Sequence, residues 1–199
     1  TLAAAGSTSS TFTISAKTNL VINGNGYTLR AQSGRIFYIQ SSSAVEMNDL
    51  TLENGWIGGS HARGGAIYLI GSSTLEMRAC TLSGSVASRT WYSEDTYGGA
   101  IYASSSILIM MTCVLSGNNV RSHGDAFGGA IYSSSSTVTL ESCVLSGNIA
   151  YGYNPNNPSS GSGHPRGGAI YSTSSRFVMT ACTLAENSAV STIADRGLG

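Results

Sequence analysis

The chain repeats one block of sequence four times, and this repeat limits the possible folds more than any other feature. One copy, GGAIYSSSSTVTLESCVLSGN, runs from Gly128 to Asn148. The other copies begin at Gly64, Gly98 and Gly167, and each copy places one cysteine 15 or 16 residues after its first glycine. The length varies almost only in the segments between the copies. A constant block joined by variable connections is typical of a solenoid, in which each repeat forms one coil.

Apolar residues recur at matching positions in each copy and in the degenerate block Gly34–Gly55. A leucine stands two positions after the cysteine position every time: Leu52, Leu82, Leu115, Leu145 and Leu184. Apolar residues at every second position of short runs indicate half-buried strands. Stacking coils about 4.8 Å apart would place like residues on one another and bury them. The sequence therefore predicts an all-β, right-handed parallel β-helix of about six coils.

Each coil should contain three short strands, AIY, TVTLE and CVL in the copy quoted above, with the variable loops along one edge. We expect a single β-helix domain over residues 1–199, with an entry coil at 1–33 and the GGAIY/LSGN repeats at 34–199. The last copy, from Gly167, is not followed by another glycine pair. This favours a fragment of a longer solenoid, whose open end could self-associate through unpaired strand edges.

The composition argues against several classes of partner. Charged residues make up 10% of the chain and the net charge is zero, so no basic face is expected to bind nucleic acid. No apolar run approaches the ~18 residues of a transmembrane segment. Motifs of the CxxC, HExxH, GxSxG and P-loop types are absent from the sequence. We therefore predict no metal, no cofactor and no transmembrane segment in this portion.

Two polar columns have structural interpretations. The asparagines of the LSGN and LAEN segments, Asn118, Asn148 and Asn187, should form a hydrogen-bonded ladder at a turn. The cysteines, Cys80, Cys113, Cys143 and Cys182, form one column beside the leucines. Either they are buried thiols that act as small hydrophobic residues, or they form disulfides between neighbouring coils, such as Cys80–Cys113 and Cys143–Cys182.

A tyrosine column follows the glycine pairs: Tyr38, Tyr68, Tyr102, Tyr132 and Tyr171. The neighbouring Phe and Ile column should point inward, which places the tyrosines on the outside of the first strand. Such a ladder could stack on sugar rings or on another protein. Alternatively, the variable loops fold back and cover it.

The chemically distinctive side chains lie in the variable segments that precede each glycine pair, and together they form the candidate binding edge. These residues are His61, Arg63, Trp91, Tyr92, Glu94, Asp95, Tyr97, Arg121, His123, Asp125, Phe127, Tyr151, Tyr153, His164 and Arg166. Asp95 and Asp125 each stand three residues before a glycine pair, so they should lie one coil apart. Such a pair could hold calcium or act as an acid and base, or the two could be ordinary solvated loop residues.

An ice-binding surface is a further hypothesis, because the chain has few charges and many Ser and Thr residues. The position after the cysteine gives the row Thr51, Thr81, Val114, Val144 and Thr183. Two valines interrupt the regular threonine row that this function would need.

The pairing of GGAIY with CVLSGN resembles the GGA[ILV] and FxxN repeats of the polymorphic outer-membrane proteins, with leucine in place of the Phe. The resemblance covers residues 34–199, and the N-terminal part is closer to generic pectin-lyase-like coils. It implies a right-handed β-helix, an extracellular or cell-surface location and adhesion to protein or glycan. We therefore expect a non-enzymatic structural or adhesive module of a surface or filament protein. The alternative is a carbohydrate-binding or carbohydrate-active β-helix, although no lyase or hydrolase catalytic set can be placed here.

Overall fold

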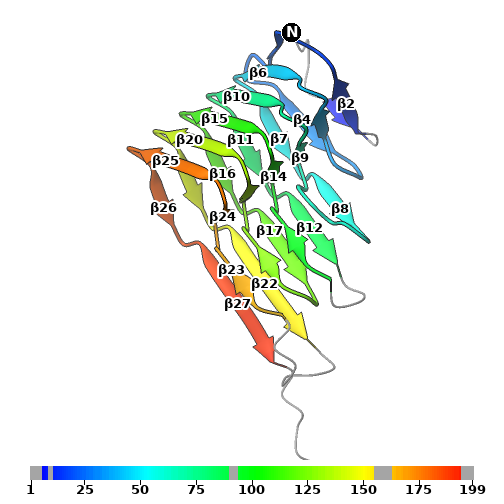
Figure 1. Ribbon diagram of the computed structural model, residues 1–199, viewed down its shortest axis with the longest axis vertical. Coiled ribbons are helices and arrows are strands. Elements are labelled where there is room, and N and C mark those ends of the chain that lie inside the picture. The colour runs from blue at the N-terminus through cyan, green and yellow to red at the C-terminus, as the bar shows by residue number, and fades with distance from the viewer. Residues whose placement is uncertain (1–5, 9–10, 90–93, 155–162, 194–199) are drawn as a thin grey trace, which may run out of the picture.

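The computed structural model describes residues 6–8, 11–89, 94–154 and 163–193, and these form a parallel β-helix (Figure 1). All pairings between the described strands are parallel, and each strand pairs with its counterpart in the next coil. No helix occurs among the described residues. The predicted all-β solenoid is confirmed.

Three sheets surround the main core, and they correspond to the three predicted strands of each coil. The tyrosine sheet holds β2 (Phe12–Ser15), β5 (Phe37–Gln40), β9 (Ile67–Leu69), β14 (Ile101–Ser104), β19 (Ile131–Ser134) and β24 (Ile170–Thr173). The methionine sheet holds β3 (Leu20–Asn23), β6 (Ala44–Asn48), β10 (Thr74–Arg78), β15 (Ile107–Met111), β20 (Thr137–Glu141) and β25 (Arg176–Thr180). The leucine sheet holds β1 (Gly6–Thr8), β4 (Thr28–Ala31), β7 (Thr51–Glu53), β11 (Thr81–Ser83), β16 (Val114–Ser116), β21 (Val144–Ser146) and β26 (Thr183–Ala185).

Two further sheets form where the sequence predicts only loops, and this is the main correction to the predicted coil. The wing sheet holds β8 (Trp56–Gly58), β12 (Val86–Arg89), β17 (Asn119–Ser122), β22 (Ile149–Asn154) and β27 (Ser188–Ile193). The return sheet holds β13 (Thr96–Tyr97), β18 (Ala126–Phe127) and β23 (Pro165–Arg166). In the coils that contain β12, β17 and β22, the chain leaves the leucine sheet along a wing strand and comes back along a return strand. Figure 1 shows the wing strands side by side, extending away from the three-sheet core.

A second, smaller core lies between the wing and return sheets. It is built from small side chains: Ala62, Ala87, Val120, Ala126 and Ala150. Small residues allow the two layers to approach closely, but they give a weaker alternating pattern than leucine or isoleucine. For this reason the sequence does not identify these segments as strands.

The leucine column lies in a single file, as the predicted stacking requires. Leu82 pairs in register with Leu115, Leu115 with Leu145, and Leu145 with Leu184. Leu82, Leu115 and Leu145 are fully buried. Leu184 is 52% exposed, because no described coil covers it.

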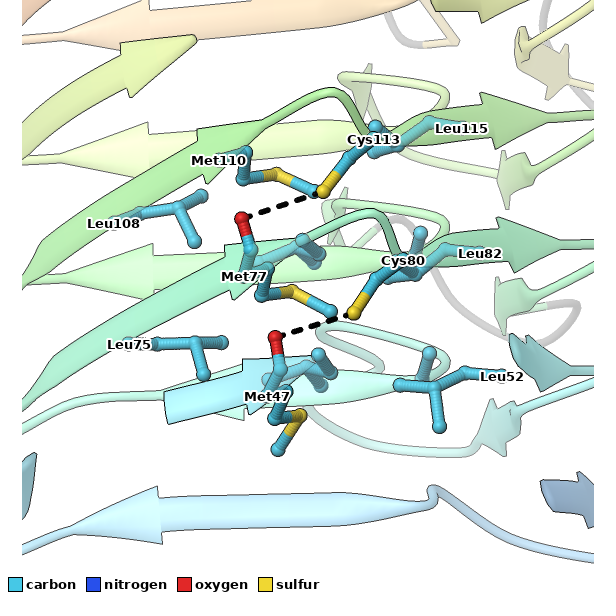
Figure 2. Close-up of a cluster of buried hydrophobic side chains, with 14 of the residues drawn as sticks. Met47, Leu52, Leu75, Met77, Cys80, Leu82, Leu108, Met110, Cys113 and Leu115 are labelled. Carbon is cyan, nitrogen blue, oxygen red and sulfur yellow. Dashed lines mark hydrogen bonds between the residues drawn. The ribbon is translucent and has the colours of Figure 1, made fainter. Parts of the chain in front are cut away.

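The sulfur-containing side chains form a second interior file beside the leucines (Figure 2). All four cysteines are free thiols. Each thiol donates a hydrogen bond to a backbone carbonyl of the preceding coil; Cys80 Sγ lies 3.3 Å from the Met47 oxygen and Cys113 Sγ lies 3.4 Å from the Met77 oxygen. The neighbouring thiols Cys143 and Cys80, together with burial, raise the pKa of Cys113. The structure therefore corresponds to the buried-thiol alternative, not to disulfides between coils.

The asparagine ladder forms as predicted at the turn after the leucine sheet. The Asn118 side-chain amide donates to the Leu82 carbonyl and to Asn148 Oδ1, both at 3.0 Å. The backbone N–H of Asn118 donates to the same Asn148 oxygen at 3.0 Å. Asn148 repeats this pattern with Leu115 and Asn187. Each asparagine thus satisfies buried backbone groups that would otherwise be unpaired.

Serines form a second ladder at the corner between the tyrosine and methionine sheets. The Ser106 N–H donates to Ser136 Oγ at 3.2 Å, and the Ser136 N–H donates to Ser175 Oγ at 3.0 Å. Each hydroxyl in turn donates to a carbonyl two residues earlier, as Ser136 does to Ser134 at 2.8 Å. The serine side chains therefore satisfy backbone hydrogen-bonding groups at this turn.

The glycine pair closes the neck where the wing meets the core. Gly128 has a φ of +70°, a conformation that glycine adopts without the steric cost of a Cβ atom. Gly129 is needed for a different reason: a Cβ there would lie 2.0 Å from the Gly168 carbonyl oxygen and 2.6 Å from the Ile149 nitrogen. The first glycine makes the turn, and the second lets the returning chain press against the start of a wing strand.

Replacing Gly129 by alanine should therefore destabilise the protein far more than replacing a glycine that only has a positive φ. We expect Gly129→Ala to lower the free energy of unfolding by more than ~3 kcal/mol, because backbone atoms cannot move aside cheaply. Gly117 is the matched control: its φ is +62°, and a Cβ there would meet no atom within 4 Å. Gly117→Ala should cost about 1 kcal/mol. Urea unfolding measures both, and equal losses would contradict this account of the neck.

Removing one member of the asparagine ladder should unpair buried groups of the preceding coil. Asn148→Ala leaves the Asn118 amide groups and the Leu115 carbonyl without their partner. We expect a loss of roughly 3–5 kcal/mol in the free energy of unfolding. Asn119→Ala is the control, because the buried Asn119 Oδ1 has no hydrogen-bond partner in the described part of the chain. A loss for Asn148→Ala no larger than that of the control would refute the role of the ladder.

Candidate functional site

The face of the return sheet that points away from the alanine core brings together eight residues of the predicted binding edge. Tyr97 pairs with Phe127, Phe127 pairs with Arg166, and Arg63 forms a bridge to Tyr97. The residues two positions earlier form a parallel column, because alternate residues of a strand share a face. We call this surface the edge site: His61, Asp95, Asp125 and His164 in one column, and Arg63, Tyr97, Phe127 and Arg166 in the other.

The two aspartates lie one coil apart, as predicted, and both carboxylates are engaged. Asp95 Oδ1 accepts the backbone N–H of Asp125 at 2.8 Å, and Asp125 Oδ1 accepts the N–H of His164 at 3.0 Å. The other oxygens face Tyr97, whose hydroxyl donates to Asp95 at 3.2 Å, and Arg166, which lies 3.5 Å from Asp125. These carboxylates therefore form a short ladder that links successive coils.

The carboxylates do not form a metal centre with their neighbours. Among the residues with defined positions, no group of three or more His, Cys, Asp or Glu side chains is arranged to hold a metal ion. Each aspartate instead uses one oxygen to cap the backbone of the next coil. This geometry stabilises the chain where it enters each return strand.

The return sheet covers Tyr102, Tyr132 and Tyr171 of the tyrosine column, as in the second of the two alternatives drawn from the sequence. Tyr97 lies 4.7 Å from Tyr132, and Phe127 lies 4.7 Å from Tyr171, measured between ring centroids. Tyr102 and Tyr132 stack with an interplanar angle of 9°, and they are only 8% and 9% exposed. Their faces contact other rings of the protein, so these two tyrosines offer little aromatic surface to a sugar.

Arginines lie at both ends of this aromatic cluster. Arg63 lies 5.5 Å from the Tyr97 ring and 5.4 Å from the Tyr102 ring, and Arg166 lies 5.5 Å from the Phe127 ring. Cations at these distances from ring faces are attracted to them. Arg63 therefore links the return sheet to the tyrosine sheet at one end, and Arg166 supports the Phe127 ring at the other.

Arg35 is a further member of this cluster that the sequence analysis missed. It lies over the Tyr68 ring at 4.6 Å and donates to the carbonyls of Gly64 and Arg63 at 2.9 and 2.6 Å. Burial lowers the pKa of its guanidinium. The available signal was its position: Arg35 aligns with Gly65, where the repeat otherwise has the second glycine.

A hollow of about 350 Å³ opens at the N-terminal end of the edge site. It is lined by His61, Arg63, Glu94, Asp95 and Tyr97. Glu94 forms an ion pair with Arg89 at 2.5 Å. The Nε atom of Arg63 is buried and has no hydrogen-bond partner among the residues with described positions. The hollow combines both signs of charge with one aromatic ring.

Other residues of the predicted edge lie elsewhere, which corrects the expectation of one continuous cluster. Arg121, Tyr151 and Tyr153 belong to the wing sheet, and the His123 ring packs edge-on against Tyr153 at 5.3 Å. Wing and return strands run out and back, so residues of one variable segment fall on different sheets. Trp91 and Tyr92 lie outside the described residues.

The threonine row runs along the outside of the leucine sheet. Thr51 pairs with Thr81, and the row continues through Val114 and Val144 to Thr183. Val144 is 38% exposed. The row is in register, and the two valines interrupt it in adjacent coils.

No protein-family model matches the chain, and no curated protein matches it. In the portion that the structure describes, no helix is long and apolar enough to cross a membrane.

Two tyrosines of the aromatic cluster should resist ionisation. Burial raises the pKa of Tyr97, and the neighbouring Asp95 carboxylate raises it further. Burial and Tyr102 raise the pKa of Tyr132. A tyrosine whose pKa is higher in the folded state stabilises the fold fully below its unfolded pKa of about 10, and this contribution is lost as the pH rises through the folded value.

We therefore predict that stability falls as the pH is raised above about 10. Tyr97→Phe should lessen the loss in the free energy of unfolding between neutral and strongly alkaline pH, because it removes one of the two groups. Urea unfolding at a series of pH values, with tyrosinate absorbance at 295 nm, measures this. Tyr27→Phe, which alters an exposed tyrosine (37%), is the control and should keep the wild-type pH dependence. Identical pH profiles for Tyr97→Phe and the wild type would contradict the prediction.

Proposed function

We propose that this chain is a non-catalytic structural or adhesive module of an extracellular surface or filament protein, and that it presents the edge site for interaction. The β-helix is a rigid scaffold whose repeat residues are used to join coils. The residues that differ from coil to coil lie on the return and wing sheets. Variable side chains on a rigid scaffold are a common arrangement for recognition.

One observation carries the non-catalytic part of the proposal: both candidate catalytic carboxylates hold backbone groups. Asp95 caps the N–H of Asp125, and Asp125 caps the N–H of His164. A general base needs an oxygen free to reach the substrate proton. Here the remaining oxygens contact Tyr97 and Arg166. This arrangement supports structural aspartates and gives no support to a polysaccharide lyase or hydrolase.

The surface location rests on the resemblance of the repeat to the polymorphic outer-membrane proteins. The geometry gives that motif a physical basis, because each glycine pair forms the neck of a wing and each terminal asparagine joins the ladder. These are requirements of a coil, and they carry no information about a ligand. Ice binding has weaker support, since the interruptions at Val114 and Val144 fall in the middle of the threonine row.

The test is turnover of polysaccharides by the wild type and by the double variant Asp95→Asn/Asp125→Asn. Asparagine keeps an acceptor oxygen for each N–H, so the double variant should fold, with a loss of about 1–2 kcal/mol in the free energy of unfolding. We expect no reducing-end or unsaturated product from either protein, measured over a panel of neutral and acidic polysaccharides. Product formation by the wild type that the folded double variant lacks would overturn the proposal.

A further inference from the structure

The outward face of the wing sheet is a broad surface that the repeat does not specify. Its strands β8, β12, β17, β22 and β27 lie side by side in Figure 1. The partner face is fixed by the alanine core, since Ile57 and Ala87 point toward that core. The alternate residues therefore point away from it: Trp56, Val86, Asn119, Ile149 and Ser188 in one column, and Gly58, Ser88, Arg121, Tyr151 and Val190 in the next.

Trp56 is the most distinctive residue on this face. It is 50% exposed, although tryptophan is usually largely buried. Its ring lies over Gly58 of its own strand: a Cβ on Gly58 would come 2.4 Å from Cη2 and 2.7 Å from Cζ2 of the indole. The other coils of the wing sheet have Ser88, Arg121, Tyr151 and Val190 at the Gly58 position. Glycine at this one position gives the indole room to lie along the strand with much of its surface exposed.

The neighbouring side chains provide hydrogen-bonding groups and a second aromatic ring. Ser88 lies on β12, the strand beside β8, Arg121 lies on β17, the strand after it, and Tyr151 lies on β22, the next strand. Three strand spacings separate Trp56 from Tyr151, a distance of about 14 Å. Among the outward-facing residues of the described wing strands, Arg121 is the only charged side chain. The surface is therefore an extended, nearly neutral platform with an aromatic ring at its edge.

We propose that the outward face of the wing sheet binds a neutral polysaccharide chain, with Trp56 as the stacking platform at one end. A sugar ring has an apolar face that packs on an exposed indole, and its hydroxyls bond to donors and acceptors such as Ser88 and Arg121. A nearly uncharged surface favours an uncharged polymer over a sulfated or uronic-acid chain. An extended chain suits a flat sheet face better than a small molecule, which usually needs a concave site.

This inference deepens the proposed adhesive function by naming the class of partner, and it can fail without affecting the non-catalytic assignment. The proposed function is tested by turnover, whereas this inference is tested by equilibrium binding. The binding surface also lies apart from the edge site, on a different sheet. Substitutions at Trp56 therefore leave Asp95 and Asp125 unaltered.

The experiment measures binding of soluble neutral polysaccharides (a β-1,3-glucan, a xyloglucan and a galactomannan) and of a sulfated polysaccharide to the whole chain. Isothermal titration and the fluorescence of Trp56 in a Trp91→Phe background give the affinity. We expect at least one neutral polymer to bind, and Trp56→Ala to weaken that binding at least tenfold. Tyr27→Ala removes an exposed aromatic ring (37%) away from the wing sheet and should bind as the wild type does.

Gly58→Ala provides a second and sharper variant, because it keeps the indole and displaces it. The new methyl group would collide with the ring, which can swing away because it is the far end of a side chain. We expect normal thermal unfolding and several-fold weaker binding. The proposal is overturned if no neutral polymer binds, if the sulfated polymer binds more tightly than all the neutral ones, or if Trp56→Ala binds like the wild type.

Discussion

The in-register stacking of coils is the interaction on which the whole structure depends. Every strand of one coil pairs with the matching strand of the next, so a residue's principal neighbour is its own counterpart. Leu115 lies between Leu82 and Leu145, and Asn118 bonds to Asn148. This arrangement favours, at each position, a residue type that packs against or bonds to the same residue type in the next coil. Leucine packs on leucine, and an asparagine amide donates to the next asparagine and accepts from the one before, whereas a charge in such a column would meet its own sign.

The same rule explains why the charged residues are few and lie at the wing, the outer faces and the ends of columns. Asp95 and Asp125 stack directly, yet each carboxylate accepts a backbone N–H of the following coil, and Arg166 lies beside the second. Arg63 and Arg166 occupy the first and last places of their column, with Tyr97 and Phe127 between them. Aromatic rings can stack upon one another in the middle of the column, whereas guanidinium groups in adjacent coils would repel one another because they carry the same charge.

The three-strand coil was predictable because its columns contain large apolar residues with a clear period of two. The turn glycines and the asparagine ladder also followed from the repeat, whereas the cover over the tyrosines was one of two alternatives that the sequence left open. The wing was not predictable, because its core is alanine and valine and its outer face differs in every coil. Because no large apolar residue recurs at matching positions in the segments before each glycine pair, the sequence predicts loops there. Arg35 and Trp56 were missed for a related reason: Arg35 lies in the degenerate block Gly34–Gly55 and Trp56 directly follows it, so neither belongs to a full copy of the repeat.

The wing changes where a function is expected on this molecule. A three-sheet coil without it would expose the tyrosine column, and the stacking faces would be available to a ligand. With it, Tyr97 and Phe127 pack over Tyr102, Tyr132 and Tyr171. The positions at which the sequence can vary from coil to coil are then those on the outer surface of the wing. Stacking still acts there, because every wing strand must pair with its neighbours, but only the inward alanines are constrained by packing. The outward positions can then differ in adjacent coils, as Trp56, Asn119 and Ile149 do, without loss of a buried contact. A solenoid of this kind separates the residues that hold it together from those that can recognise a partner, and the separation lies between the two faces of a single sheet.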